Sequence, residues 1–285
     1  MTTTAESYAY CEGVARSRAR NFYWSFLLLP KAKRRAMCAV YAFMRECDDL
    51  SDGERASAEA MAGWRADLDR ALTGEPGAHP LWPALMDTVE RYQIPHRYLI
   101  EMIDGVESDL KAHDFETFDE LYRYCYLVAS VVGLTIIHIF GFDDPAALVL
   151  AEKCGVAFQL TNIIRDVAED RDEGRVYLPR EEMRRFGVES VKQNSPELRR
   201  LLESMAGRAR AYYEESRPLI GMMHKDSRAS LWALVEIYSR LLDRIAASSY
   251  DVLPKRIRLS SWEKAWILVQ AQFHDSGIPG GRRPG

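Results

Sequence analysis

Cysteine is scarce in this sequence, and its spacing is irregular. The five cysteines among 285 residues lie far apart, and no two of them form a CxxC pair. An odd number of widely spaced cysteines is not typical of a disulfide framework or of a zinc site. Four of the five lie in apolar, helix-like segments, so we expect small core side chains in a reducing compartment. The cysteines are Cys11, Cys38, Cys47, Cys125 and Cys154.

The chain also lacks an excess of positive charge. It has 38 Lys and Arg against 42 Asp and Glu, which gives a formal net charge of −4. Proteins that bind nucleic acid need a basic surface to contact the phosphate backbone. The composition therefore argues against nucleic acid as a partner.

Signals for secretion or membrane insertion are not found either. The first residues, MTTTAESYAYCEG, have neither the basic region nor the apolar core of a signal peptide. The longest apolar run, residues 127–140, contains Ser130, Thr135 and His138. A bilayer span needs about 20 apolar residues, so we expect no transmembrane helix and a cytoplasmic location.

Helical periodicity dominates the chain, and the alternation typical of strands is hard to find. With 47% hydrophobic and 28% charged residues, the composition is that of a globular protein. We predict one all-α domain over residues 1–285 with roughly ten helices, a loop over residues 171–182, and a frayed tail from about residue 274. Helices are predicted over residues 31–52, 54–72, 81–92, 95–111, 118–140, 146–170, 197–219, 227–249 and 262–272.

A polar face is predicted at the end of the helix over residues 31–52. Asp48 and Asp52 are four residues apart, Arg45 lies three before Asp48, and Tyr41 lies four before Arg45. Residues three or four apart share one side of an α-helix. This face therefore collects two carboxylates, a guanidinium and a phenol.

A second polar face is predicted near the end of the helix over residues 146–170. Its side chains are again three or four residues apart, so they share one helix face. One arginine lies beside this face in the helix, and another lies in the loop that follows. The face carries Gln159, Asn162, Asp166 and Asp170, and the two arginines are Arg165 and Arg175.

Two interpretations of these faces compete. Acidic helix ends are most often simply solvated surface. However, like charges at this spacing destabilise a helix by a few tenths of a kcal/mol, carboxylates at a helix C-terminus oppose its dipole, and both faces end very apolar helices. Mg²⁺ prefers oxygen ligands and keeps substrate phosphates among them. We therefore favour a diphosphate-binding Mg²⁺ site, with the arginines as a phosphate clamp.

The two faces occur together with further motifs that carry a family resemblance. The motifs are ARNFYWSFLLLP at residues 19–30, YCYLVASVVG at 124–133 and GRVYLP at 174–179. With them, residues 8–270 resemble the squalene and phytoene synthase family. The resemblance implies the isoprenoid synthase fold, a single helical bundle around a central cavity that opens between two aspartate-rich helices. It also implies an enzyme, a prenyltransferase that joins two prenyl diphosphates head to head.

The same resemblance implies roles for individual residues. Asp48 and Asp52 match the first Mg²⁺-binding pair of the family, and Asn162, Asp166 and Asp170 match the second set. Asp48 and Asp166 are also assigned catalytic roles, as is Tyr126, which matches an aromatic residue that steadies the cation or leaving group. The positions that match substrate-binding residues are Tyr41, Arg45, Gln159, Arg165, Arg175, Tyr238 and Arg256. The stretch Arg18, Ala19, Arg20 and Asn21 matches a further substrate-binding loop, in which serine is common at the position of Asn21.

Within the family, the motifs are closest to bacterial presqualene diphosphate or squalene synthases of hopanoid pathways. The expected reaction joins two farnesyl diphosphates to presqualene diphosphate. The alternatives are a phytoene synthase that uses geranylgeranyl diphosphate and a bifunctional squalene synthase that uses NADPH. A non-catalytic helical partner protein of a multi-enzyme pathway is disfavoured, because both acidic motifs are intact.

The expected cofactor is Mg²⁺, with Mn²⁺ as a substitute. NADPH is not expected, because no GxGxxG loop joins a strand to a helix. The expected partners are prenyl diphosphates, a membrane surface contacted peripherally during release of an apolar product, and other enzymes of the pathway.

Two further groups have more ordinary interpretations. Asp104, Glu107 and Asp109 are expected to form a solvated acidic face. The aromatic residues Phe22, Trp24, Phe26 and Phe43 fit a plain core or the wall of an apolar tunnel equally well.

Overall fold

The computed structural model describes residues 2–18, 22–51, 57–109 and 114–274 of the chain. Throughout these ranges the regular structure is helical, and the single extended pairing in them is an isolated bridge between Phe142 and Met223. The predicted all-α class is therefore confirmed. The helices are α1 (Thr4–Arg18), α2 (Phe22–Phe26), α3 (Lys31–Ser51), α4 (Ala58–Leu72), α5 (Trp82–Arg91), α6 (His96–Asp109), α7 (Phe118–Cys125), η1 (Tyr126–Ser130), α8 (Val131–Phe140), α9 (Ala146–Asp172), α10 (Arg180–Phe186), α11 (Pro196–Ser216), α12 (Leu219–Met222), α13 (Lys225–Ala247) and α14 (Ser261–His274).

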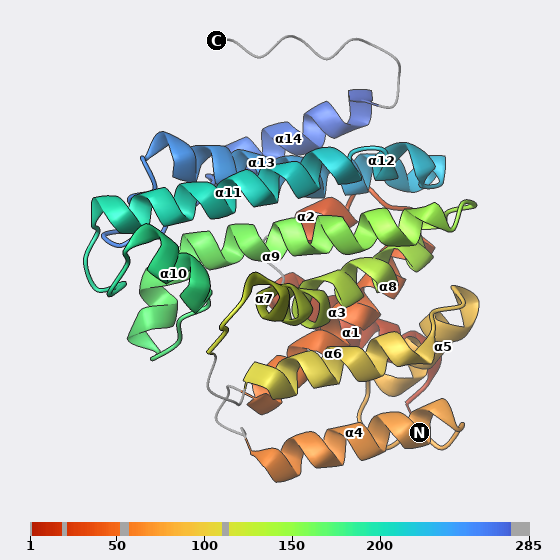
Figure 1. Cartoon of the computed structure of the whole chain (residues 1–285). Helices are drawn as coiled ribbons and strands as arrows, with labels where there is room; N and C mark the ends of the chain where they lie inside the picture. Colours follow the sequence, from red (N-terminus) through yellow and green to blue (C-terminus); the bar gives the residue numbers. More distant parts are fainter. Residues whose placement is uncertain (1, 19–21, 52–56, 110–113, 275–285) are drawn as a thin grey trace.

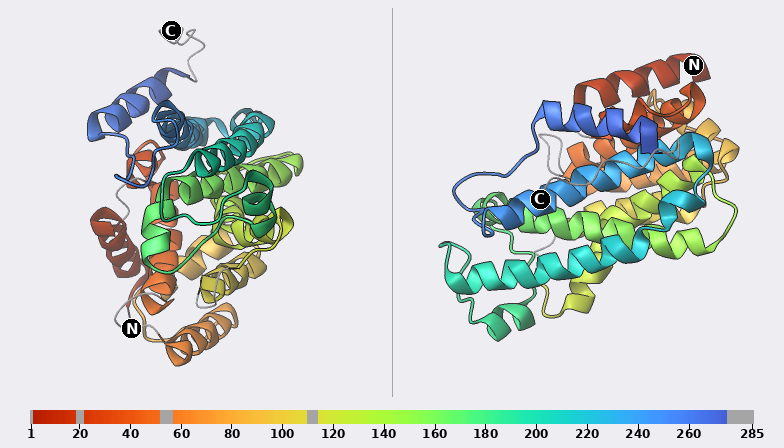
Figure 2. Two further views of the ribbon diagram at one scale, coloured as in Figure 1. Left: turned by 60° about the vertical axis from the view of Figure 1, so that its left-hand side comes forward. Right: turned by 90° about the horizontal axis from the view of Figure 1, so that it is seen from above.

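The helix α9 runs through the middle of the molecule (Figure 1). It packs along α11 on one side and against η1 and α8 on another, and it also contacts α13. In the view of Figure 1, α11, α13 and α14 lie above α9, while α3, α1, α6 and α4 lie below it. The left-hand view in Figure 2 shows the same order of layers from a further side, and the right-hand view shows the molecule from above.

Two buried apolar clusters hold these layers together. One is built mainly from α1, α3, α4, α5, α6 and α8, and the other mainly from α7, α9, α11, α13 and α14. Phe158 of α9 and Val235 of α13 pack against both clusters. All five cysteines are buried free thiols, as expected for core residues, and burial raises the pKa of Cys154 to about 12.

The segment predicted as one continuous helix over residues 118–140 contains a π-helical turn. Residues Tyr126–Ser130 form this turn, η1, between α7 and α8. Glycines of two neighbouring helices press on it: a Cβ on Gly105 of α6 would lie 2.9 Å from the carbonyl oxygen of Leu127, and a Cβ on Gly155 of α9 would lie 2.5 Å from Cα of Ser130. Single π-helical turns inside α-helices are frequent at functional sites.

Gly155→Ala is expected to lower the melting temperature. The added methyl group would meet backbone atoms of Ser130, which cannot rotate away. Overpacking of this kind costs about 1–3 kcal/mol, or several degrees in Tm for a chain of this size. The matched control is Gly207→Ala in α11, where no neighbouring atom lies within 4 Å of the new Cβ. Since alanine favours helix over glycine by about 1 kcal/mol, the control should raise Tm, and a similar shift in both variants would contradict the close approach.

The sequence analysis missed four helices, α1, α2, α10 and α12, and set other boundaries too early or too late. The predicted loop over residues 171–182 is shorter, because α9 continues to Asp172 and α10 begins at Arg180. In α1 the buried side is made of small or polar residues, including Ser7 and Tyr8. The backbone amide of Ala84 donates to Ser7 Oγ at 2.9 Å, and the Tyr8 hydroxyl donates to Asp87 at 2.6 Å. Such a helix gives little hydrophobic periodicity.

Two helical segments are long and apolar enough to cross a membrane by length and composition alone. They are residues 118–140 and 146–172, and half or more of the apolar window of each is buried inside the fold. Core helices of folded proteins meet the same criterion, and the second segment carries the polar face described below. The predicted tail after residue 274 lies outside the described residues.

Candidate active site

The C-terminal half of α3 presents the first predicted face. One side of this half is buried through Phe43, Cys47 and Leu50, which fixes the opposite side toward the site. On that side Asp48 is exposed and Arg45 is half-buried. The guanidinium of Arg45 forms an ion pair with Asp49, one turn further along the helix.

Charged groups gather around Tyr41 of α3. Burial raises the pKa of the Tyr41 hydroxyl, the positive charges of Arg45 and Arg18 oppose that rise, and the negative charge of Asp48 adds to it. Arg18 lies at the exposed end of α1. Four predicted site residues therefore share one neighbourhood. The predicted residues Ala19, Arg20, Asn21 and Asp52 lie outside the described residues.

One donor of Arg45 has no partner among the residues that the structure describes. Its Nε atom is buried and makes no hydrogen bond, although the Nη2 atom of the same side chain is paired with Asp49. A buried guanidinium N–H without an acceptor is costly, and an anionic oxygen is the acceptor that suits it best.

The second predicted face lies on α9. Asn162 Nδ2 donates to Gln159 Oε1 at 3.3 Å, which confirms that these two side chains lie together. The other amide atom, Asn162 Oδ1, is buried and has no hydrogen-bond partner. A buried acceptor left in this state suits a cation or a donor that the described protein atoms do not supply.

Two arginines hold Asp166. Arg165 binds both carboxylate oxygens, with its Nε 2.7 Å from Oδ1, and Arg256 reaches Oδ2 from the segment before α14 at 3.0 Å. Arg256 also forms an ion pair with Glu169 at 2.6 Å. The predicted residues Arg165, Asp166 and Arg256 therefore meet at one carboxylate, although Arg256 is 90 residues away in the sequence.

Asp170 lies one turn beyond Asp166 among further carboxylates. Burial raises its pKa to about 7, and the negative charges of Asp166 and Glu173 add to that rise. Arg175 acts in the opposite direction and also lies 3.7 Å from Glu173. The end of α9 therefore concentrates carboxylates, and at Asp170 the effect of Arg175 does not outweigh burial and repulsion.

The predicted tyrosines occupy two different environments. Tyr126 begins the π-helical turn, and its hydroxyl donates to Glu101 of α6 at 3.0 Å, which together with burial raises its pKa to about 12. Tyr238 of α13 is buried and stacks on Phe158 of α9, with ring centroids 4.4 Å apart. Burial raises the pKa of Tyr238, and Arg165 and a hydrogen bond with Asn162 oppose that rise, so this ring lies beside the α9 face.

Comparison with known proteins identifies the family. A family model described as squalene/phytoene synthase matches residues 14–263. The chain belongs to the squalene/phytoene synthase family. Members of this family are prenyltransferases of isoprenoid biosynthesis that bind prenyl diphosphates, so the predicted enzyme class is confirmed.

Curated relatives are similar over nearly the whole chain. The 15-cis-phytoene synthase of Synechococcus elongatus is 34% identical, over 96% of this chain and 94% of the relative. The phytoene synthase of Mycobacterium bovis is 36% identical, over 95% of this chain and 92% of the relative.

Solved structures share the fold. A dehydrosqualene synthase crystallised with a ligand has a TM-score of 0.89 and 32% identity, over 96% of this chain and 98% of that one. The squalene synthase HpnC from Alicyclobacillus acidocaldarius has a TM-score of 0.82 and 27% identity, over 87% of this chain and 95% of that one. The predicted isoprenoid synthase fold is thereby confirmed.

The family uses a divalent metal to ionise the diphosphate, and the residues present suit one. Among the described residues, no group of three His, Cys, Asp or Glu side chains is placed to hold a metal ion. Asp52 lies outside the described residues. Asn162 Oδ1 has no partner among the described residues, Asp170 is crowded by other carboxylates, and Asp166 already binds two arginines; all three side chains offer hard oxygen atoms. This donor set fits Mg²⁺ or Mn²⁺.

Sequence reasoning missed several residues of the site. Asp49 is four residues after Arg45, so the same spacing rule could have found it. Glu169 lies beside Asp166 and follows the same logic. Glu101 and Phe158 had no such signal, because their partners Tyr126 and Tyr238 come from other helices.

Asp104 and Glu107 are not merely solvated, since both bind Arg65 of α4, while nothing is described for the side chain of Asp109.

An open groove of about 740 Å³ lies elsewhere, between α11, α12 and α13. It is lined by mixed charged and apolar side chains such as Arg210, Arg217 and Trp232. None of the predicted site residues lines it, so it has no part in the proposed chemistry.

Proposed function

We propose that this prenyltransferase joins two farnesyl diphosphates head to head to form presqualene diphosphate. The observation that carries the proposal is a pair of buried atoms that have no hydrogen-bond partner among the described residues, Arg45 Nε on α3 and Asn162 Oδ1 on α9. One is a donor that suits a diphosphate oxygen, and the other is an acceptor that suits a cation. The likeness to dehydrosqualene synthase and squalene synthase supports a C30 product.

In the proposed reaction, Arg45 and Arg165 bind the diphosphate of the donor substrate through charge-assisted hydrogen bonds. Asp48 of α3 together with Asp52, and Asn162, Asp166 and Asp170 of α9, would hold Mg²⁺. A bound divalent ion supplies further neutralisation of the leaving group. The C1–O bond of the donor then breaks, the diphosphate departs with the bonding electrons, and an allylic cation remains.

The second farnesyl group completes the condensation. Its double bond attacks C1 of the cation, and loss of a proton closes the cyclopropane of presqualene diphosphate. Water would quench the cation, so apolar side chains such as Phe158 act by excluding it. The Tyr126 hydroxyl, fixed by Glu101, is assigned to steadying the cation or the departing diphosphate.

A second candidate function has its own support. The curated relatives at 34% and 36% identity are phytoene synthases. On that alternative, the same site joins two geranylgeranyl diphosphates to give a C40 product.

The products of the purified chain test both candidates. The chain is incubated with Mg²⁺ and either farnesyl or geranylgeranyl diphosphate, with and without NADPH, and the extracts are analysed by mass spectrometry. We expect presqualene diphosphate from farnesyl diphosphate, unchanged by NADPH. Squalene that forms only with NADPH would show a bifunctional enzyme, phytoene would favour the second candidate, and no condensation of either substrate would contradict both.

We further propose a cytoplasmic location and contact with other enzymes of the pathway.

A further inference from the structure

The outer side of α14 carries a stripe of exposed apolar residues. Trp262 is 86% exposed and Trp266 is 58% exposed, and both are unusually open for tryptophan. The spacing of the stripe is four, three and four residues, so its members point in nearly one direction from the helix. We call this set the α14 stripe: Trp262, Trp266, Val269 and Phe273.

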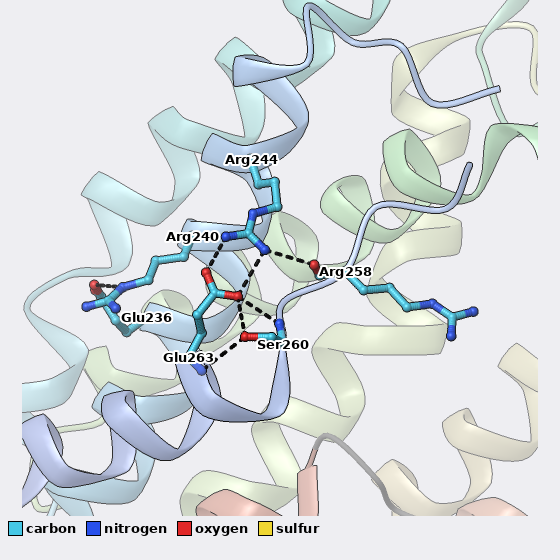
Figure 3. A network of polar contacts seen from close by, with 6 residues as sticks. All are labelled: Glu236, Arg240, Arg244, Arg258, Ser260 and Glu263. Atoms are coloured by element: carbon cyan, nitrogen blue, oxygen red, sulfur yellow. Dashed lines mark hydrogen bonds and ion pairs between the residues drawn. The ribbon is translucent and has the colours of Figure 1, made fainter. Parts of the chain in front are cut away.

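The opposite side of α14 is fastened to the protein. Ile267 and Ala271 are fully buried in the apolar cluster, and Gln270 accepts a hydrogen bond from Arg240 of α13 at 2.7 Å. At the start of the helix, Glu263 accepts hydrogen bonds from Arg244 and Ser260, which lie close together in Figure 3. These contacts fix the rotation of α14 about its axis, so the stripe is a permanent outer face.

The exposed apolar surface extends to the neighbouring helix. The short helix α2 packs against α14, and its Trp24 and the following Leu27 are also exposed. Trp24 was a candidate for the core, and the structure places it at the surface instead. In Figure 1, α14 lies at the upper edge of the molecule, with α13 beneath it.

The charge of the surrounding segment has the opposite sign to that of the whole chain. Arg256 is paired with Asp166 and Glu169 in the site; without it, the described residues 255–274 contain three Lys or Arg and one Asp or Glu, a net charge of +2 in a chain whose net charge is −4. Among the described residues, Arg258 is exposed; burial lowers the pKa of the Lys264 ammonium group, and the nearby charge of Arg258 lowers it further. In Figure 3 the side chain of Arg258 points away from the network around Glu263.

We propose that the α14 stripe docks the protein on the surface of an anionic lipid bilayer. Tryptophan and phenylalanine on one helix face, with basic residues close by, are the features of helices that lie in a membrane interface. The positive charge of the segment suits anionic headgroups, whereas two copies docked stripe to stripe would bring their positive charges together. The helix lies flat on the bilayer and does not cross it.

Co-sedimentation of the full chain with vesicles tests this proposal. Vesicles of phosphatidylcholine, alone or mixed with phosphatidylglycerol, are used without any substrate, so the result is independent of the proposed reaction. We expect binding to the mixed vesicles that weakens as salt is raised. The double variant Trp262→Ser, Trp266→Ser should bind roughly tenfold less, because both aromatic anchors are removed.

Two exposed valines provide a matched control. Val269→Ser lies in the stripe, where the side chain is 44% exposed, and Val149→Ser lies on α9, where it is 58% exposed. Only the first should weaken vesicle binding, while circular dichroism should be the same for both. Equal binding by the double variant, or no binding by the unaltered chain, would overturn the proposal. A dimer in solution that the double variant dissociates would also overturn it and assign the stripe to a second copy.

Discussion

Replacing Asp166 with asparagine is expected to reduce kcat/KM by about a thousandfold or more while the protein stays folded. The proposed ligand loses its charge, and a metal contribution of several kcal/mol to transition-state stabilisation is lost with it. Relief of repulsion from Asp170 stabilises the folded variant, whereas loss of the ion pairs with Arg165 and Arg256 destabilises it. We expect a net loss of about 2 kcal/mol in the free energy of unfolding, because Arg165 and Asp166 are largely buried whereas Arg256 is partly exposed to solvent.

The matched control for this variant is Asp172→Asn on the same helix. Asp172 is exposed at the end of α9, where it pairs with the neighbouring Arg171. Steady-state kinetics with farnesyl diphosphate should show near-normal values for the control, and circular dichroism should show equal helix content in both variants. Near-normal kcat/KM in Asp166→Asn would mean that this carboxylate is only a partner of two structural arginines.

Arg45→Gln is expected to lower kcat/KM by about a hundredfold, and Arg45→Lys by about tenfold. Glutamine removes the charge, whereas lysine keeps the charge but lacks the Nε donor, which is buried without a partner in the described part of the chain. Loss of one well-placed donor to developing negative charge costs about 10² to 10³ in rate. Comparing the loss of kcat/KM in the two variants therefore separates the contribution of charge from that of the guanidinium geometry.

The control for the arginine is Arg70→Gln in α4, an exposed residue that forms an ion pair with Asp67 within its own helix. It should leave the kinetic constants unchanged. If both Arg45 variants also kept normal kinetic constants while their melting temperatures fell, the ion pair with Asp49 would be the sole role of this arginine.

Much of the fold was predictable because a helix depends mainly on the spacing of apolar residues within a few turns of one another. The apolar spacing in α3, α9, α11 and α13 gave their positions to within a few residues. Prediction failed for α1, whose buried side is small and polar, and for the π-helical turn Tyr126–Ser130. That turn lies close to Gly105 of α6 and Gly155 of α9. The sequence of residues 118–140 does not indicate how closely α6 and α9 approach this segment.

The candidate site divides in the same way. Spacing of three and four residues placed Gln159 beside Asn162, and it gathered Tyr41, Arg45 and Asp48 on one part of α3. The assignments of individual roles to these residues remain predictions that the variants above test. Partners from distant segments could not be predicted from spacing, because the choice among many arginines and glutamates depends on how helices pack.

The sequence by itself determined the all-α class, the two acidic helix faces and, through its motifs, the family, because each depends on residues within a few turns of one another. Only the tertiary structure decided that Arg256 meets Asp166, that Glu101 holds Tyr126, and that Trp24 is exposed whereas Phe26 and Phe43 are buried. It also decided that the aromatic side of α14 faces outward. An apolar stripe has the same sequence pattern whether it faces a core or a solvent-exposed surface, and only the arrangement of the other helices distinguishes the two.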